Sequence, residues 1–217
     1  MGSVENNLNQ IKEKAPNTRI LAVSKYVSAD KIIEAYNAGL RDFAESKTQD
    51  SLEKMEQIPD EMLSNITWHF IGHLQTNKVK KIVGVFDYIH SVDSFKLAEV
   101  INAKANEKGV IQKIFLQVNN AEEESKFGFS IEEVKKAFAE IIKLDHIKVS
   151  GLMNIAPLCN DKQLLHKLFR EIRELKEHLE KEHNYQLDEL SMGMSEDYEV
   201  AIEEGSTIIR IGNKLFN

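Results

Sequence analysis

The sequence predicts an α/β protein folded as a (β/α)8 TIM barrel, and three observations support this. Eight short apolar runs alternate with amphipathic segments over all 217 residues. Seven of these runs are followed by a helix-like segment, and an eighth run closes the chain, which is the count for such a barrel. The third observation is that the chain has only three prolines and no linker-like stretch. We therefore expect a single barrel domain over residues 1–217, with a doubly wound open sheet as the rival fold.

Four strand–helix units are expected in the first half of the chain. The first strand, "RILAVS", precedes a helix over "SADKIIEAYNAGL", in which Ile32, Ile33, Ala35 and Tyr36 suit one helix face and Gly39 ends the helix. The next three units are "RDFAE" with "TQDSLEKMEQ", "TWHFIG" with "TNKVKKIV", and "FDYIHSV" with "SFKLAEVINAKANEKG". The segment before "RILAVS" is expected to add an N-terminal helix.

The second half of the chain completes the pattern. "QKIFLQV" precedes "SIEEVKKAFAEIIKL", and "IKVSGLMNI" precedes the longest helix, expected from about Asp161 to Glu182. Its apolar stripe consists of Leu164, Leu165, Leu168, Phe169, Ile172, Leu175 and Leu179. "LDELSM" with "SEDYEVAIEEG" forms the seventh unit, and "STIIRIG" is the eighth strand.

Composition removes several classes of function. The net charge of -7 argues against a general nucleic-acid binder, because affinity for the phosphate backbone comes from clustered Lys and Arg. The single cysteine, Cys159, excludes an internal disulfide and a cysteine-based zinc site. No stretch reads as a membrane span or a signal peptide. We expect a cytoplasmic protein, and a monomer, because no helix has an obvious surplus apolar face.

Barrel sites lie at the carboxyl ends of the strands, so residues there are the candidates. They are Ser24, Lys25, Glu45, Ser46, His69 to Gly72, His90, Ser91, Asn119, Asn154, Met192 to Ser195, and Arg210 to Asn213. Lys25 is either a solvated lysine at a strand end or an amine of lowered pKa that forms Schiff bases. The lysine alone does not decide between these two roles.

The closing segment, "LSMGMSEDYEVAIEEGSTIIRIG", indicates an anion site. Barrels often bind phosphate with the loops after strands seven and eight, where Ser195, Gly212 and Asn213 lie. Ser195 is expected to be the N-cap of the next helix, which leaves backbone N–H groups free for an anion. The alternative is a cap alone, with no ligand. Arg210 ends an apolar strand, so its charge needs a partner, and a group facing it stays unprotonated.

Two histidines in "HFIGH", His69 and His73, have the spacing of a helical metal pair. On a strand, however, four residues span about 13 Å, which is too far for one ion. We therefore expect no metal site, with His69 pointing into the barrel mouth. Trp68 and Phe70 are expected to pack on the other face of the strand.

Several motifs resemble those of one family along nearly the whole chain. They are "AVSK" at 22–25, "WHFIGHLQTNK" at 68–78, "HSVDS" at 90–94, "KFG" at 126–128, "GLMNIAP" at 151–157 and the closing segment at 190–212. The chain resembles the YggS/PROSC family of pyridoxal-phosphate homeostasis proteins. The resemblance implies a barrel like the N-terminal domain of alanine racemase, carrying pyridoxal 5'-phosphate (PLP).

The resemblance also implies roles for individual residues. Lys25 would hold the cofactor as an aldimine, and Arg210 would face its pyridine nitrogen. Ser195, Gly212 and Asn213 would hold its phosphate. Met194, His69, Asn154 and Ser46 would line the pocket.

The chain departs from the family at residues 43–46, where "FAES" stands in place of Phe-Gly-Glu-Asn. Ala44 adds a methyl group, and Ser46 is shorter than asparagine. A polar contact near the cofactor is expected to be lost or bridged by water, while Lys25 is untouched.

Two functions of different classes follow. The first is a protein that binds PLP reversibly and serves vitamin B6 and amino-acid homeostasis without robust catalysis, with amino acids or PLP-dependent apoenzymes as candidate partners. The second is an enzyme resembling amino-acid racemases, which needs acid–base groups on both faces of the substrate. The eight units extend to Asn217 and leave no sequence for a further domain, which favours the first function. A barrel aldolase that uses Lys25 without a cofactor is a third, weaker hypothesis.

Overall fold

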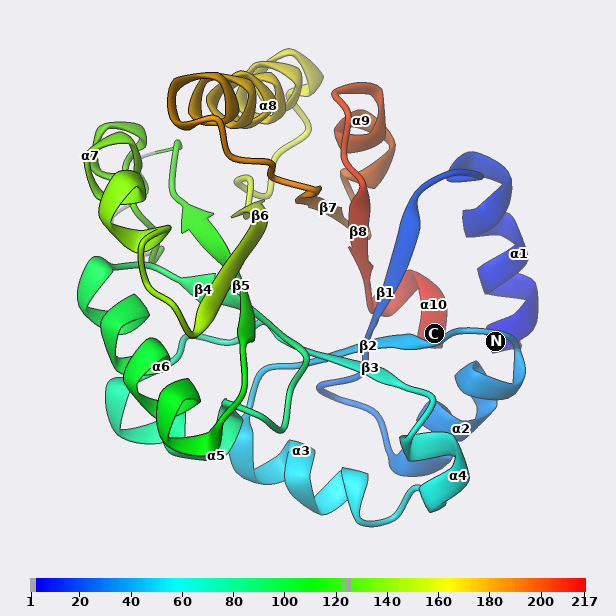
Figure 1. Cartoon of the computed structure of the whole chain (residues 1–217). Coiled ribbons are helices and arrows are strands. Elements are labelled where there is room, and N and C mark those ends of the chain that lie inside the picture. The colour runs from blue at the N-terminus through cyan, green and yellow to red at the C-terminus, as the bar shows by residue number, and fades with distance from the viewer. Residues whose placement is uncertain (1–2, 122, 124–125) are drawn as a thin grey trace.

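A computed structural model describes residues 3–121, 123 and 126–217. Over this part of the chain the strands form a closed parallel barrel in the order β1 to β8 (Figure 1). They are β1 (Arg19–Val23), β2 (Asp42–Glu45), β3 (Thr67–Phe70), β4 (Tyr88–Val92), β5 (Gln112–Val118), β6 (Ile147–Asn154), β7 (Glu189–Met194) and β8 (Ile208–Ile211). Because β8 pairs with β1, the predicted barrel is confirmed and the open sheet is wrong.

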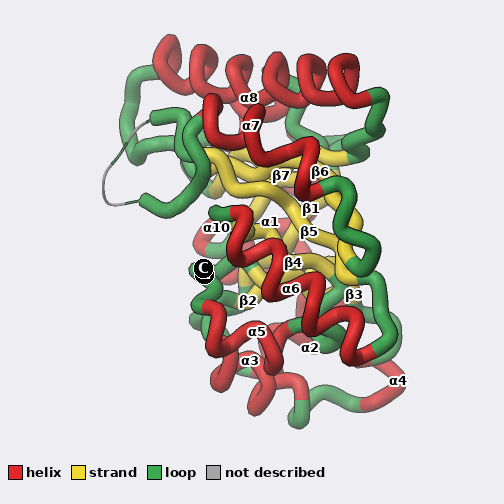
Figure 2. The backbone as a smooth tube through the Cα atoms, turned by 60° about the vertical axis from the view of Figure 1, so that its left-hand side comes forward, coloured by secondary structure: helices red, strands yellow, loops and turns green. Residues whose placement is uncertain are grey.

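Helices surround the barrel (Figures 1 and 2). They are α1 (Val4–Lys14), α2 (Ala29–Asn37), α3 (Thr48–Met55), α4 (Asp60–Leu63), α5 (Val79–Ile82), α6 (Phe95–Lys108), α7 (Ile131–Ile141), α8 (Lys162–His183), α9 (Tyr198–Glu203) and α10 (Asn213–Phe216). The expected N-terminal helix is α1, and Asn7 on it donates a 3.0 Å hydrogen bond to the carbonyl of Leu215. The helix expected over "TNKVKKIV" is divided into a 3-10 turn, Thr76–Lys78, and the short α5.

The longest helix, α8, begins and ends where the sequence indicated. The Asp161 side chain accepts a hydrogen bond from the Leu164 N–H, which caps the first turn. Asn184 ends the helix in the left-handed conformation, with φ at 47°. The predicted stripe faces the barrel except for Leu164, which is 37% exposed. The helix is therefore held by a capped amphipathic face that covers β6.

Two apolar layers pack against the strands. The outer layer lies between the sheet and the helices and contains Trp68 and Phe70, as expected. The inner layer fills the barrel and consists of Leu21, Ala44, Phe115, Met153 and Ile208. Polar residues share the interior with this layer and are described below. In the described part of the chain, no helix has both the length and the apolar character needed to cross a membrane.

Candidate functional site

A cavity of about 520 Å³ opens at the carboxyl ends of the strands. The predicted site residues that line it are Lys25, Ser46, Met194, Ser195, Arg210, Gly212 and Asn213. Its apolar walls include Val23, Ile71, Met153 and Ile155. A volume of this size, with a few polar groups among apolar walls, is typical of sites for small molecules. The fold therefore gathers seven of the nine predicted residues around one cavity.

Lys25 follows β1, and the backbone before it is held from behind the sheet. The Ser24 N–H donates to the carbonyl of Ala44 at 3.0 Å, and the Ser24 hydroxyl donates to Glu45 Oε1 at 2.7 Å. Lys54 on α3 donates to the Ser24 carbonyl at 2.7 Å and forms an ion pair with Glu45. The Lys25 side chain itself is half-buried, with Nζ 5.0 Å from the ring centroid of Tyr26. The cavity thus contains a primary amine on a fixed backbone.

Arg210 lies at the floor of the cavity, and its hydrogen bonds go to neutral oxygens. Nη1 donates to the carbonyl and to the hydroxyl of Ser191, at 2.6 and 2.8 Å, and Nη2 donates to the carbonyl of Asn154 at 2.7 Å. Burial lowers the pKa of the guanidinium to about 10, and the Asp197 carboxylate partly opposes this change. Arg210 is therefore still charged at neutral pH, and its orientation is fixed by three oxygens.

The loops after β7 and β8 meet at Ser195, whose hydroxyl accepts a 3.5 Å hydrogen bond from the Lys214 N–H. The expectation that Ser195 caps the next helix is wrong, because α9 begins at Tyr198 and Asp197 precedes it. The Asp197 carboxylate instead accepts from the Met194 N–H and closes a tight turn. Ser195 is therefore held in the cavity wall by the first turn of α10, which follows β8.

A bulge at Gly193 turns the end of β7 toward the cavity. Its φ is 87°, and an added Cβ would lie 2.6 Å from the Ala201 Cβ and 2.8 Å from the Tyr198 Cα. The register between β7 and β8 shifts over this segment. Only glycine fits here, and the resulting bend positions Met194 and Ser195.

Two of the predicted pocket residues lie elsewhere. His69 is fully buried inside the barrel, below the cavity, where its ring contacts His90 and Asp42. Asn154 extends its side-chain amide to Asn120, 3.1 Å away, and contributes only its carbonyl to Arg210. Pocket-lining roles for His69 and Asn154 are therefore wrong: His69 sits one layer too deep, and the Asn154 side chain faces outward.

The cavity also has walls that the sequence analysis did not assign. Glu196 and Asp197 line it beside Ser195, and Tyr26 and Leu158 form an exposed rim. Burial raises the pKa of Asp197, while the Met194 N–H and Arg210 oppose this change. Exposed apolar rim residues give no periodic signal in a sequence, so pattern reasoning could not find them. Among the described residues, no cluster of three or more His, Cys, Asp or Glu side chains is placed to hold a metal ion.

Comparison with known proteins gives one consistent result. A family model for the alanine racemase N-terminal domain matches residues 1–217. A pyridoxal phosphate homeostasis protein of Aquifex aeolicus is 43% identical over 198 residues, covering 91% of this chain and 86% of the relative. A protein of the same name from Synechocystis is 41% identical over 204 residues, covering 93% and 91%. The solved structure of PipY from Synechococcus elongatus with PLP bound has a TM-score of 0.89 at 35% identity, covering 99% of this chain and all of PipY. The chain therefore belongs to the family of pyridoxal phosphate homeostasis proteins, which has the fold of the alanine racemase N-terminal domain.

Proposed function

We propose that this chain binds pyridoxal 5'-phosphate reversibly, with covalent attachment to Lys25, and serves homeostasis of vitamin B6 and amino acids without robust catalysis of its own. The names of its relatives and the PLP-bound structure of PipY support this proposal. The observation that carries it is the placement of Lys25, Arg210 and Ser195 on one cavity.

The chemistry of the cavity fits this cofactor. When bound, PLP supplies an aldehyde that condenses with a primary amine with loss of water, and its ring nitrogen and phosphate need separate partners. Lys25 is the primary amine. The Arg210 guanidinium has only donors to offer a ring nitrogen. Ser195 and Asn213, on the loops after β7 and β8, supply polar groups for the phosphate, and Gly212 adds no side chain between them.

The protonated guanidinium of Arg210 supports a binding role for the cavity over a catalytic one. With a pKa of about 10, the guanidinium keeps its proton at neutral pH and donates to whatever faces it. A ring nitrogen opposite Arg210 is therefore held unprotonated, which makes the ring a poorer electron sink. Arg210 is thus suited to hold the cofactor more than to activate it.

Titration of the purified protein with PLP, followed by absorbance, tests the proposal. Absorbance is read after unbound PLP has been removed by desalting. Wild-type protein is expected to be yellow at that point, and to lose the colour when it is incubated with a competing primary amine and desalted again. Lys25→Ala is expected to remain folded and stay colourless, while Lys214→Ala, which removes a nearby lysine, behaves as wild type. Wild-type protein that does not bind PLP would contradict the proposal.

The catalytic alternative needs a separate assay. Incubation of the loaded protein with single-enantiomer alanine is expected to give no racemisation at rates typical of enzymes. Turnover of a few per second or more would replace the binding role with an enzymatic one.

A further inference from the structure

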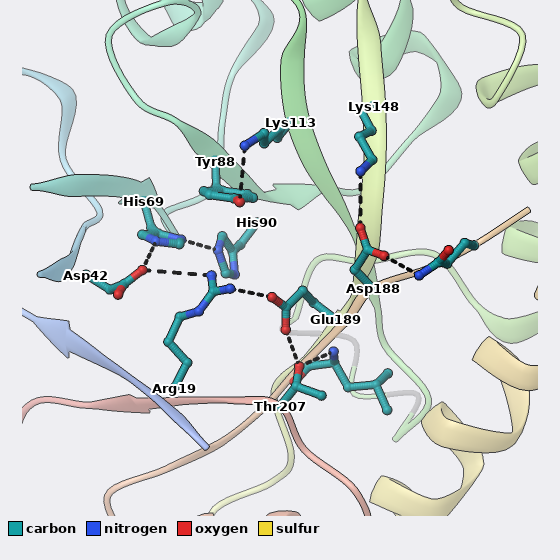
Figure 3. Close-up of polar contacts among 12 residues, drawn as sticks. Arg19, Asp42, His69, Tyr88, His90, Lys113, Lys148, Asp188, Glu189 and Thr207 are labelled. Atoms are coloured by element: carbon teal, nitrogen blue, oxygen red, sulfur yellow. Dashed lines mark hydrogen bonds and ion pairs between the residues drawn. The ribbon is translucent and has the colours of Figure 1, made fainter. Parts of the chain in front are cut away.

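A line of polar side chains runs through the barrel interior from its amino-terminal end to Arg210. Figure 3 shows its lower part, where Asp42 lies against His69 and His69 against His90. The distances are 3.1 Å from Asp42 Oδ1 to His69 Nε2, and 2.8 Å from His69 Nδ1 to His90 Nε2. The line continues over 3.1 Å from His90 Nδ1 to Ser191 Oγ, and over 2.8 Å from Ser191 Oγ to Arg210 Nη1. We call these five residues the interior network.

The Asp42 carboxylate, together with two neutral histidines, fixes the direction of every hydrogen bond in the interior network. Arg210 can only donate, so Ser191 Oγ accepts from it and keeps its own proton available for His90 Nδ1. His90 then donates from Nε2 to His69 Nδ1. His69 in turn donates from Nε2 to the Asp42 carboxylate, which can only accept. If both histidines instead carried their protons on Nδ1, two unprotonated acceptors, His69 Nε2 and Asp42 Oδ1, would face each other.

Burial keeps both histidines neutral, as this arrangement requires. Both rings are fully buried, and His90 is stacked on Phe115 at 4.0 Å between centroids. Desolvation lowers the pKa of His90 well below its ordinary value, and the nearby His69, Arg210 and Arg19 act in the same direction. Desolvation also lowers the pKa of His69, although Asp42 opposes this.

The outer end of the interior network is held by charges at the amino-terminal end of the barrel. Arg19 lies 3.8 Å from Asp42 and forms a second ion pair with Glu189 (Figure 3). Glu189 accepts a further 2.6 Å hydrogen bond from the Thr207 hydroxyl. Asp42 is therefore a fixed, charged anchor on β2, on the side of the barrel opposite the cavity.

We propose that Asp42, His69, His90 and Ser191 are positioning residues for Arg210, because one directed series of hydrogen bonds, with both histidines as Nε2–H tautomers, fixes the guanidinium that faces the cavity. Each bond polarises the next, so the Asp42 carboxylate supports the Arg210 charge across the barrel. The consequence for the bound cofactor rests on the proposed function. The tautomers are a property of the protein alone.

The first test needs no cofactor and no substitution. Ring ¹⁵N chemical shifts distinguish protonated from unprotonated histidine nitrogens in the apo protein at pH 7. For both His69 and His90, we expect Nδ1 to be unprotonated and Nε2 to carry the proton. A doubly protonated ring, or a proton on Nδ1 of either residue, would overturn the proposal.

The second test separates the direction of the network from its charge. Asp42→Asn keeps an oxygen that accepts from His69, whereas Asp42→Ala removes it. We expect the Ala variant to give mixed tautomers at His90 and to raise the Kd for PLP on the order of fivefold. The Asn variant is expected to keep the wild-type tautomers and stay closer to wild-type affinity. Asp188→Ala is the matched control, because Asp188 is a carboxylate at the same end of the barrel that pairs with Lys148 outside the network.

The two arms separate failure of this inference from failure of the proposed function. Wild-type protein that does not bind PLP would refute the proposed function and leave the ¹⁵N result to stand alone. Binding by wild type with equal affinity and absorbance in Asp42→Ala, despite altered tautomers, would refute the positioning role. If Asp42→Ala does not fold, the wild-type tautomers and the Asn variant still decide the direction of the network.

Discussion

The Lys54 ammonium group donates a 2.7 Å hydrogen bond to the carbonyl oxygen of Ser24, the residue that precedes Lys25. The same group neutralises the Glu45 carboxylate, which is only 1% exposed. A helix on the outside of the barrel thereby fixes the strand end from which the amine of the candidate site extends.

Lys54→Met is expected to lower the free energy of unfolding by about 3 kcal/mol, because it leaves the buried Glu45 carboxylate without its cation. Adding Glu45→Gln to the same protein should recover part of the loss. Chemical denaturation at pH 7 measures both effects. Lys47→Met is the control, since its ion pair with Asp50 is exposed and contributes little. A loss below about 1 kcal/mol for Lys54→Met would show that Glu45 finds other partners.

Arg210→Ala is expected to raise the Kd for PLP about tenfold or more, because it removes a charged hydrogen-bond donor from the cavity floor. Arg210→Lys keeps the charge but cannot reach both Ser191 and Asn154, so it should recover only part of the affinity. Absorbance titration gives the affinity and the spectrum of the bound cofactor together. An unaltered spectrum and affinity in the Ala variant would contradict the role assigned to Arg210.

Ser195→Ala is expected to weaken PLP binding about fivefold, equivalent to about 1 kcal/mol for one neutral hydroxyl contact. The effect should be smaller for pyridoxal, which lacks the phosphate. Ser94→Ala provides the control, because that hydroxyl caps α6 and its loss should lower stability without changing affinity. Equal losses for PLP and pyridoxal would remove Ser195 from the phosphate site.

The buried His90 makes stability depend on pH in a known direction. Its pKa in the folded protein is well below the unfolded value of 6.5. Stability is therefore fully present above pH 6.5 and is lost as the pH falls, because the unfolded chain gains a proton that the folded protein does not. Between pH 6 and pH 5, wild type should lose up to about 1.4 kcal/mol per pH unit more than His90→Phe. Urea unfolding at several pH values measures this difference, and parallel curves would show that folding does not lower the pKa of His90.

Local patterns were enough to predict the fold. The apolar runs have the length of buried strands, and the capping residue Asp161 begins α8 where the stripe begins. Short elements were harder to predict, because the 3-10 turn and the helix at residues 76–82 depend on packing and not on periodicity. The closure of the barrel could be predicted only from the count of units.

The site was predicted less completely, for reasons that concern strand geometry. Lys25 and Arg210 lie where strand ends indicated. His69 does not, because the layer in which an interior residue lies depends on register, and β3 places it beside Ala44 and Tyr88. Asn154 ends β6, beyond a register shift between β5 and β6. Such a shift changes the face on which a side chain points, and no sequence pattern records it.

The most direct test of the central claim is borohydride reduction of the PLP-loaded protein, followed by digestion and peptide mass mapping. A carbon–nitrogen double bond to Lys25 predicts one irreversible label, on the peptide that contains Lys25, and its absence from Lys25→Ala treated in parallel. A label on another lysine, or binding of PLP that leaves no label after reduction, would contradict attachment at Lys25.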